Sequence, residues 1–154
     1  MELSYIKATL DDLEWLAESR ILVLKAVNKL DDSVDMTEIK KQSYDYYKRA
    51  LADGTHVAYL VFDQNTFVGA GGISFFQVMP TYHNPTGNKA YIMNIYTNPD
   101  YRRMGIAHKI LDFLVSASRE KGISAICLEA TDMGRPLYEN YGFIAMNDEM
   151  ELSQ

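Results

Sequence analysis

The feature that most constrains the fold is a change in the spacing of apolar residues between positions 90 and 130. Residues 90–96 have the composition and length of a strand. Over residues 103–121 the apolar positions instead recur every three or four residues, as on one face of a helix, and Gly122 ends the pattern. A continuous apolar run at 123–130 then predicts a strand buried on both faces. We therefore expect a sheet with a helix packed against it.

The remaining segments add strands and helices to this unit without a linker or an internal repeat between them. The predicted fold class is α/β in content and α+β in arrangement, with a mixed, largely antiparallel central sheet flanked by helices. The chain is expected to form one domain, residues 1–154, since this length buries a single core. The other predicted elements are a strand at 3–10, a helix covering 13–27 that is capped by Thr9, Asp11 or Asp12, a helix at about 37–52, a hairpin of strands 56–62 and 67–78, a loop at 79–89, a short helix at 136–141 and one or two short strands within 143–152.

Charge argues against a nucleic-acid partner, because the formal net charge is −6 and a protein that coats nucleic acid is usually basic. Only the stretch 65–121 is net positive. The single cysteine, Cys127, excludes an intrachain disulfide and favours a reducing compartment. No basic leader and no apolar stretch of membrane-spanning length is found, so we expect a cytoplasmic protein with no membrane partner.

The chemistry is predicted where the strand at 90–96 leads into the long helix. The first N–H groups of a helix have no internal partner and the helix dipole is positive there, so this end can bind a phosphate through the backbone. Gly105 would allow a phosphate to approach closely, and Arg102 and Arg103 add positive charge.

Other motifs fit less well. The run Gly69-Ala70-Gly71-Gly72 resembles a dinucleotide loop, but strand residues follow it where a helix start is needed. His56, His83 and His108 are scattered, with no cysteine or carboxylate at ligand spacing, so no metal is expected. No nucleophile motif is present.

Two patches carry a resemblance to a known family. The first is Arg102-Arg103-Met104-Gly105-Ile106-Ala107, and the second is Leu137-Tyr138-Glu139-Asn140-Tyr141-Gly142-Phe143. They resemble, respectively, the acyl-CoA motif and the Leu-Tyr-Glu…Gly-Phe signature of the GCN5-related N-acetyltransferase (GNAT) superfamily. The resemblance implies a fold in which two central strands splay apart to form a cleft, and an enzyme that moves an acetyl group from acetyl-CoA to a primary amine by direct attack.

The resemblance also implies roles for individual residues. Backbone amides of Arg103, Met104, Gly105, Ile106 and Ala107 would hold the pyrophosphate with Arg102 nearby, and Ile95 and Thr97 would pair with the pantetheine arm. Where many relatives have an asparagine that touches this arm, the chain has Thr131, a shorter group. Tyr138 would act as general acid toward the departing thiolate, because a phenol is un-ionised at pH 7.

The sequence identifies neither the general base nor the acceptor. The glutamate that relatives often carry on the strand at 90–96 is missing, so the candidates for the general base are Glu129, Asn94, Tyr96 and solvent. The resemblance assigns the acceptor pocket to the first two helices and the loop at 79–89, which makes Tyr82 and His83 of that loop candidates for contact with a small-molecule or peptide amine. Asn94, on the strand at 90–96, is a further candidate for this contact. Dimers are common among relatives, so a homodimer is a candidate assembly. The alternative functions are a non-catalytic acyl-CoA sensor or partner-binding domain of the same fold, and a plain nucleotide-binding domain.

Overall fold

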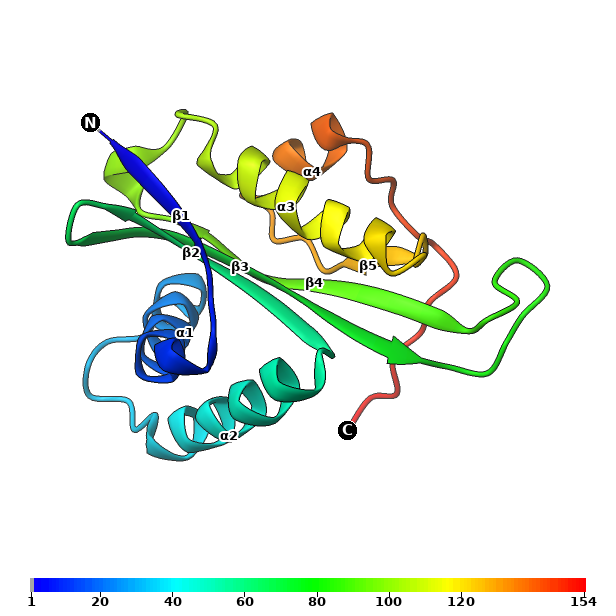
Figure 1. Ribbon diagram of the computed structural model, residues 1–154, viewed down its shortest axis with the longest axis horizontal. Coiled ribbons are helices and arrows are strands. Elements are labelled where there is room, and N and C mark those ends of the chain that lie inside the picture. Colours follow the sequence, from blue (N-terminus) through cyan, green and yellow to red (C-terminus); the bar gives the residue numbers. More distant parts are fainter. Residues whose placement is uncertain (1) are drawn as a thin grey trace.

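A five-stranded mixed sheet between two layers of helices forms the fold of the computed structural model, which describes residues 2–154. The elements are β1 (Leu3–Lys7), η1 (Leu10–Asp12), α1 (Leu13–Asn28), α2 (Thr37–Asp53), β2 (His56–Asp63), β3 (Thr66–Gln77), β4 (Asn88–Thr97), η2 (Pro99–Tyr101), α3 (Ile106–Glu120), β5 (Ile126–Leu128) and α4 (Arg135–Tyr141). The strands lie in the order β1-β2-β3-β4-β5, and only β4 and β5 are parallel. Helices α1 and α2 cover one face, and α3 and α4 lie over the other (Figure 1). The predicted fold class is confirmed.

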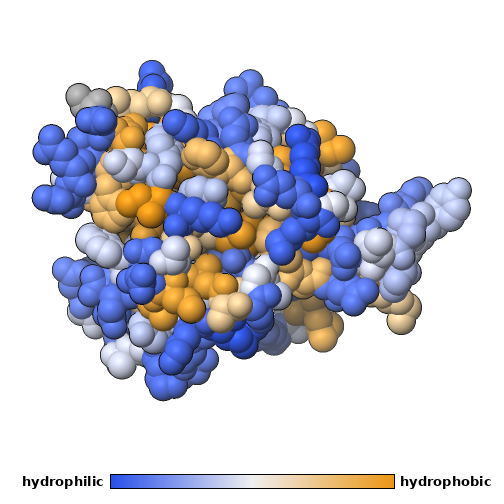
Figure 2. Space-filling model, viewed as in Figure 1, coloured by the Kyte–Doolittle hydropathy of each residue, from blue (hydrophilic) through white to orange (hydrophobic). Residues whose placement is uncertain are grey.

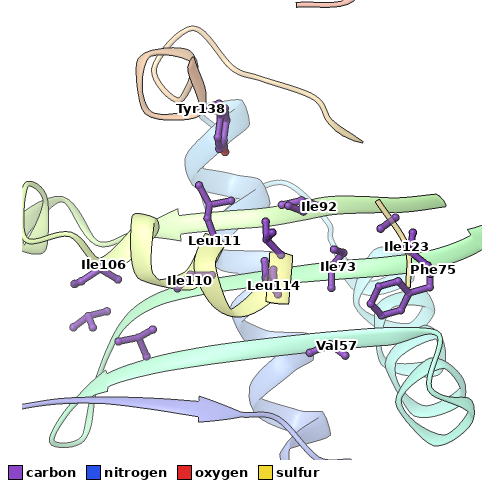
Figure 3. Packing of buried hydrophobic residues seen from close by; sticks show 14 residues of the cluster. Val57, Ile73, Phe75, Ile92, Ile106, Ile110, Leu111, Leu114, Ile123 and Tyr138 are labelled. Atoms are coloured by element: carbon purple, nitrogen blue, oxygen red, sulfur yellow. The ribbon is translucent and has the colours of Figure 1, made fainter. Parts of the chain in front are cut away.

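Helix α3 packs on the sheet through the apolar face that its sequence predicted. Figure 3 shows Ile106, Ile110, Leu111 and Leu114 lying over the strands, together with Ile73 of β3. Each is at most 2% exposed, and burying a side chain of this size contributes about 1.5–3 kcal/mol relative to leaving it in water. This cluster fixes the position of α3 on the sheet, including its first residue, Ile106.

Two adjacent glycines in β3 serve packing on opposite faces. A Cβ built on Gly71 would meet Ile110 of α3 and lie 2.9 Å from Ile95 Cδ1. A Cβ built on Gly72 would lie 2.7 Å from His56 Nε2 on the other face. The glycine run that resembled a nucleotide loop is therefore part of a strand. Its missing side chains let α3 approach closely on one face and leave room for the imidazole of His56, a residue of β2, on the other.

The second helical layer covers a smaller core. Thr9 and Asp12 form a capping box, in which the Thr9 backbone N–H donates to Asp12 Oδ2 at 2.8 Å. The chain then turns through η1 into α1, which buries Leu16 against Leu60 of β2, while Tyr47 of α2 joins the same cluster. Both predicted helices are confirmed, and Thr9 is a cap as predicted, but it caps the η1 turn that leads into α1, whereas Asp12 at the start of α1 makes no capping hydrogen bond with its side chain there.

Two predicted boundaries in the strand–helix–strand unit are wrong. The long helix begins at Ile106 rather than Arg103, because Arg103 and Gly105 have positive φ values of 64° and 77°, which interrupt a right-handed helix. The strand predicted at 123–130 shrinks to β5, and its three residues are half-buried rather than fully buried. Because β5 pairs with β4 alone, its other edge stays unpaired within the described residues.

The strands predicted within 143–152 do not form. The chain after α4 has no regular structure, and Ile144, Met150 and Leu152 are exposed, Met150 by 99%. Apolar and polar residues do alternate here, but a strand needs a hydrogen-bonded neighbour, and the short β5 does not provide one. Separately, none of the helices within residues 2–154 combines the length and hydrophobicity needed to span a bilayer.

Adding a methyl group at Gly71 should be costly. We expect Gly71→Ala to lower the free energy of unfolding by about 1–3 kcal/mol, because the new Cβ overlaps Ile110. Urea denaturation measures this loss. In a Gly71→Ala/Ile110→Ala double variant, the combined loss should be smaller than the sum of the two single losses, because the smaller side chain vacates the contested space. Strict additivity would contradict this account.

Candidate functional site

Strands β4 and β5 separate after three paired residues, which leaves one edge of β4 open. Pairing runs from Ala90 opposite Ile126 to Ile92 opposite Leu128 and stops there. At the same place β4 has an irregularity: Asn94 has a positive φ of 63°, and the register with β3 shifts. Within the described residues, Ile95 and Thr97 therefore lie on a strand edge that β5 leaves uncovered. Such an edge can pair with an extended ligand.

Beyond the open edge, the start of α3 presents free backbone donors. Gly105 caps the helix with no side-chain hydrogen bond, and the first turn carries no acidic residue that would offset the helix dipole. An ideal Cβ on Gly105 meets no atom within 4 Å, so the space above it is open. The Tyr101 hydroxyl donates to Asp63 Oδ2 at 2.8 Å and so ties the connecting turn to β2.

Positive charge surrounds this helix start. Arg102, Arg103 and Met104 are exposed, and no carboxylate within residues 2–154 lies within 4.0 Å of either arginine. The side chain of Ile106 is buried in the core, so only its N–H faces outward at the helix start. The next residue, Ala107, follows in the first turn of α3. All six residues of the predicted acyl-CoA motif therefore lie around one open helix end.

The two tyrosines of α4 have different surroundings. The Tyr141 hydroxyl donates to Asp112 Oδ1 of α3 at 2.7 Å, and burial followed by this bond raises the pKa of Tyr141 to about 12. Tyr138 is 9% exposed, extends from α4 toward the sheet (Figure 3), and burial raises its pKa. No hydrogen bond holds the Tyr138 hydroxyl in the part of the chain that the structure describes. Tyr141 therefore connects α4 to α3 through a hydrogen bond, whereas Tyr138 has a neutral hydroxyl that is free to donate one.

Thr131 and Glu129 lie near α4 and β5 but have local partners. The Thr131 hydroxyl accepts a hydrogen bond from the Gly134 N–H at 3.1 Å, which shapes the turn into α4. Glu129 is exposed beside Tyr91; burial and then the negative charge of Glu129 raise the pKa of Tyr91 to about 12. Side-chain alternation puts Tyr91 on the same face of β4 as Met93.

A pocket of about 450 Å³ opens on the α1–α2 face of the sheet, next to the irregularity in β4. Residues of α1, α2, β2, β3 and β4 line it: Arg20, Glu38, Ile39, Gln42, Ser43, Tyr46, Tyr47, His56, Ser74, Met93 and Asn94. Asn94 is thus brought to the pocket as predicted, and its Oδ1 accepts from Arg20 Nη1 at 2.9 Å. Glu129 is not among the lining residues.

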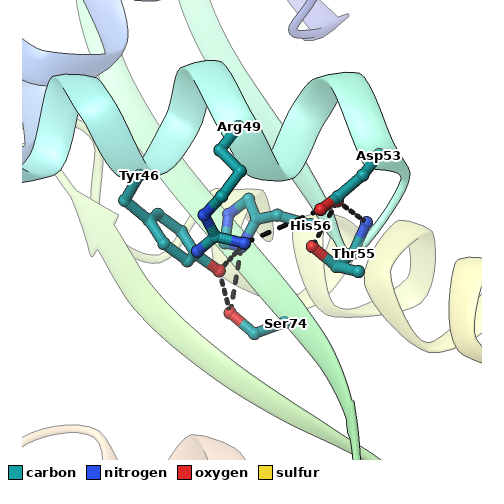
Figure 4. A network of polar contacts seen from close by, with 6 residues as sticks. All are labelled: Tyr46, Arg49, Asp53, Thr55, His56 and Ser74. Atoms are coloured by element: carbon teal, nitrogen blue, oxygen red, sulfur yellow. Dashed lines mark hydrogen bonds and ion pairs between the residues drawn. The ribbon is translucent and has the colours of Figure 1, made fainter.

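A half-buried hydrogen-bond network connects three residues that line this pocket (Figure 4). His56 Nδ1 lies 2.9 Å from the Tyr46 hydroxyl and 3.0 Å from the Ser74 hydroxyl, and the two hydroxyls are 2.6 Å apart. His56 Nε2 is buried and has no hydrogen-bond partner among residues 2–154. Burial, and then the positive charge of Arg20, lower the pKa of His56 to about 4. The imidazole is therefore neutral at pH 7 and orients the two hydroxyls.

Tyr82 and His83 are not brought to the pocket. Both lie in the connection between β3 and β4, which extends away from the rest of the molecule (Figure 1) and has a mainly hydrophilic surface (Figure 2). Tyr82 is 93% exposed, and neither residue lines the pocket described above. Within residues 2–154, no three His, Cys, Asp or Glu side chains gather closely enough to hold a metal ion.

The residues that sequence reasoning missed are Arg20, Tyr46, His56 and Ser74. The resemblance pointed to the first two helices, but it did not single out any of these side chains. The contacts that define them cross long stretches of chain: 74 positions separate Arg20 from Asn94, and 18 separate His56 from Ser74. No local pattern encodes such pairs.

His56 predicts a pH dependence of stability. Its pKa is lower in the folded state than the ordinary 6.5, so the unfolded chain binds the proton first as pH falls. We expect stability to decrease by about 2 kcal/mol between pH 7 and pH 5, because each pKa unit corresponds to about 1.4 kcal/mol. Urea denaturation at the two pH values measures this loss. It should shrink in His56→Gln and persist in His83→Gln; equal losses in the wild type and in His56→Gln would contradict it.

Comparisons with known proteins agree with this arrangement. A solved structure of a predicted acetyltransferase with acetyl-CoA from Clostridium acetobutylicum is 34% identical, with a TM-score of 0.89, and the match covers 99% of this chain and 96% of that one. A GCN5-related N-acetyltransferase from Ralstonia eutropha shares the fold, with a TM-score of 0.84, 23% identity and 99% of each chain covered.

Named relatives match over shorter regions. A thialysine N-epsilon-acetyltransferase from Mus musculus is 30% identical over 88 residues, which cover 57% of this chain and 49% of that protein. A glucosamine 6-phosphate N-acetyltransferase from Trypanosoma brucei brucei is 26% identical over 81 residues, covering 53% and 55%. The chain thus matches about half the length of these relatives. The acetyltransferase (GNAT) family model matches residues 14–143, and the chain belongs to that family.

Proposed function

We propose that the protein is an N-acetyltransferase that moves the acetyl group of acetyl-CoA to a primary amine by direct attack. The observation that carries the proposal is the juxtaposition of an uncovered β4 edge with the open, positively charged start of α3. One feature suits an extended amide-bearing arm and the other a pyrophosphate, and CoA contains both.

The described residues fit acetyl-CoA. Backbone N–H groups from Arg103 to Ala107 would bind the pyrophosphate, supported by the charge of Arg102. Ile95 and Thr97 would pair with the pantetheine arm along β4. The thioester would then lie near the irregularity at Asn94, where the pocket on the other face begins. Thr131 is a weaker candidate, because its hydroxyl already accepts the Gly134 N–H.

In the proposed reaction, an amine from the pocket on the α1–α2 face of the sheet meets a thioester held along β4. A neutral amine nitrogen in the pocket attacks the thioester carbonyl carbon, the C–N bond forms, and the C–S bond breaks as the thiolate departs. Tyr138 donates the proton that the thiolate receives and becomes a phenolate. The nitrogen loses a proton to solvent, and solvent returns a proton to the Tyr138 phenolate, which closes the cycle. The raised pKa of Tyr138 keeps the phenol protonated until the thiolate appears.

Solvent is the proposed acceptor of the amine proton, because neither His56 in the pocket nor Glu129 is suited to be the base. His56 is neutral with a pKa of about 4, so it holds a proton poorly at pH 7. Glu129 lies beside Tyr91, outside the pocket lining. The pocket is open to water at its rim, where Glu38 is exposed.

Acetyl-CoA binding can be tested with two matched glycine variants. Gly105 and Gly122 lie at opposite ends of α3, have φ values of 77° and 74°, and have open space at the Cβ position. Alanine should strain both positions about equally, by about 1 kcal/mol. Only Gly105→Ala should weaken acetyl-CoA binding, because only its methyl group would stand over the pyrophosphate site.

A thermal-shift titration measures this difference. For the wild type, acetyl-CoA at 100 times its Kd should add about 2.7 kcal/mol and raise the Tm by several degrees, whereas ATP and NAD should not. Equal weakening in Gly105→Ala and Gly122→Ala would remove the α3 start from the binding site. A larger shift with ATP or NAD than with acetyl-CoA would indicate a nucleotide-binding domain instead.

The role of Tyr138 is tested against its neighbour Tyr141. We expect Tyr138→Phe to lower kcat about tenfold or more, with little change in acetyl-CoA binding, because only the proton donor is lost. Tyr141→Phe removes the bond to Asp112 and should lower stability by about 1 kcal/mol while leaving kcat nearly unchanged. Release of free thiol measures turnover. An unchanged kcat in Tyr138→Phe would exclude its role as general acid.

A further inference from the structure

Arg20 is a cation in the pocket without an anionic partner. Lys25, Lys40, Lys41 and Arg49, which lie on the same two helices, each have a carboxylate oxygen within 4.0 Å. For Arg20, no carboxylate within residues 2–154 meets this limit. Within the described part of the chain, its one hydrogen bond goes to the neutral amide of Asn94, so four of the five guanidinium N–H donors have no partner there.

The rest of the pocket leaves this charge uncompensated. His56 and Tyr47 are neutral at pH 7, because burial lowers the pKa of His56 to about 4 and raises that of Tyr47 to about 12. The one acidic lining residue, Glu38, is exposed at the rim and accepts a hydrogen bond from Gln42 Nε2 at 2.9 Å. A half-buried guanidinium in such surroundings favours an anion, since the local dielectric constant is below that of water.

The position of Arg20 limits where that anion lies in the acceptor. Arg20 is bonded to Asn94, the residue at which β4 changes register and beside which the thioester would lie. An anionic group on Arg20 would therefore be only a few atoms from the reacting nitrogen. The remainder of the pocket, along Ile39, Tyr46 and Met93, would hold the rest of the molecule.

We infer that the acceptor is an amine with a carboxylate one or two carbons from the nitrogen, as in a free α-amino acid, and that Arg20 binds this carboxylate. The inference rests on the proposed acetyltransferase activity. A carboxylate fits better than a phosphate, because Arg20 is the only cation among the pocket-lining residues and its planar fork matches a carboxylate with two parallel hydrogen bonds.

Matched substrates test the inference in a free-thiol-release assay. L-leucine, L-histidine and L-tyrosine are each compared with their amides and with their decarboxylated amines, isoamylamine, histamine and tyramine. Glucosamine 6-phosphate and glucosamine form the phosphate pair. We expect kcat/KM for at least one amino acid to exceed that of its amide and of its decarboxylated amine by about 10- to 100-fold, the range for a charge-assisted hydrogen-bonded pair.

Variants assign that preference to Arg20. Arg20→Gln should lower kcat/KM for the preferred amino acid about 10- to 100-fold more than it lowers kcat/KM for the decarboxylated amine, because only the amino acid loses a carboxylate contact. For the preferred amino acid, Arg20→Lys should have a kcat/KM between those of the wild type and Arg20→Gln, because lysine keeps the positive charge but lacks the planar fork of donors. The control is Lys48→Gln, which removes the same charge from an exposed position of α2. Lys48 has no carboxylate oxygen of residues 2–154 within 4.0 Å and does not line the pocket. This variant should change neither value.

Acetyl-CoA thermal shifts on every variant separate the possible failures. If no protein responds to acetyl-CoA, the proposed function falls and the inference falls with it. If acetyl-CoA binds but no amine is acetylated, the protein is an acyl-CoA-binding domain and both again fall. If amines are acetylated but the carboxylate gives no preference, if Arg20→Gln affects both amines of a pair equally, or if the phosphate pair shows the largest preference, the inference is overturned and the acetyltransferase assignment stands.

Discussion

The local conformation of β4 at Asn94 is the constraint on which the site depends. An ordinary strand residue would keep β4 regular, but Asn94 adopts a positive φ of 63°, and asparagine tolerates this region better than most residues. The extra residue sends Asn94 toward Arg20 on one face, while Ile95 packs near Gly71 under α3 on the other. One backbone irregularity thereby links the helix that would hold the CoA phosphates to the pocket that would hold the amine.

Close packing around β3 makes that link stable. Glycine in a strand interior costs about 0.5–1 kcal/mol relative to alanine, yet β3 has glycine at both 71 and 72. The cost is offset because α3 approaches through Ile110 on one face and His56 lies against Gly72 on the other. His56 in turn fixes the hydroxyls of Tyr46 and Ser74 in the lining of the pocket. The conformation of the strand and the polarity of the pocket thus depend on the same pair of small residues.

The sequence predicted what is periodic or contiguous. The apolar repeat of α3, the motif from Arg102 to Ala107 and the short helix before Gly142 all lie within single segments, so local rules were enough to find them. The helix start was displaced by three residues, because the positive φ of Arg103 is not visible in its residue type.

Other features could not be read from the sequence for two physical reasons. Arg20 stands out only because no carboxylate of the described residues lies beside it. In the sequence it is a single arginine on an amphipathic helix, and such a side chain usually lies in solvent. Which lysines and arginines of α1 and α2 are paired with carboxylates becomes known only once the helices are packed. The segment after Phe143 alternates as a strand would, but alternation specifies a face and not a partner, and β5 is too short to supply one.

The acidic surface and the cationic pocket act over different distances. Surface charges are screened beyond about 8 Å at physiological ionic strength, so the net charge of −6 has little influence on an anion that has already entered the pocket. There, two unit charges 4 Å apart interact by about 4 kcal/mol at an effective dielectric constant of about 20, against about 1 kcal/mol in water. Arg20 would therefore outweigh the more numerous surface carboxylates at the position where the proposed acceptor binds. Because His56 and Tyr47 are neutral, a single guanidinium sets the sign of the potential beside Asn94.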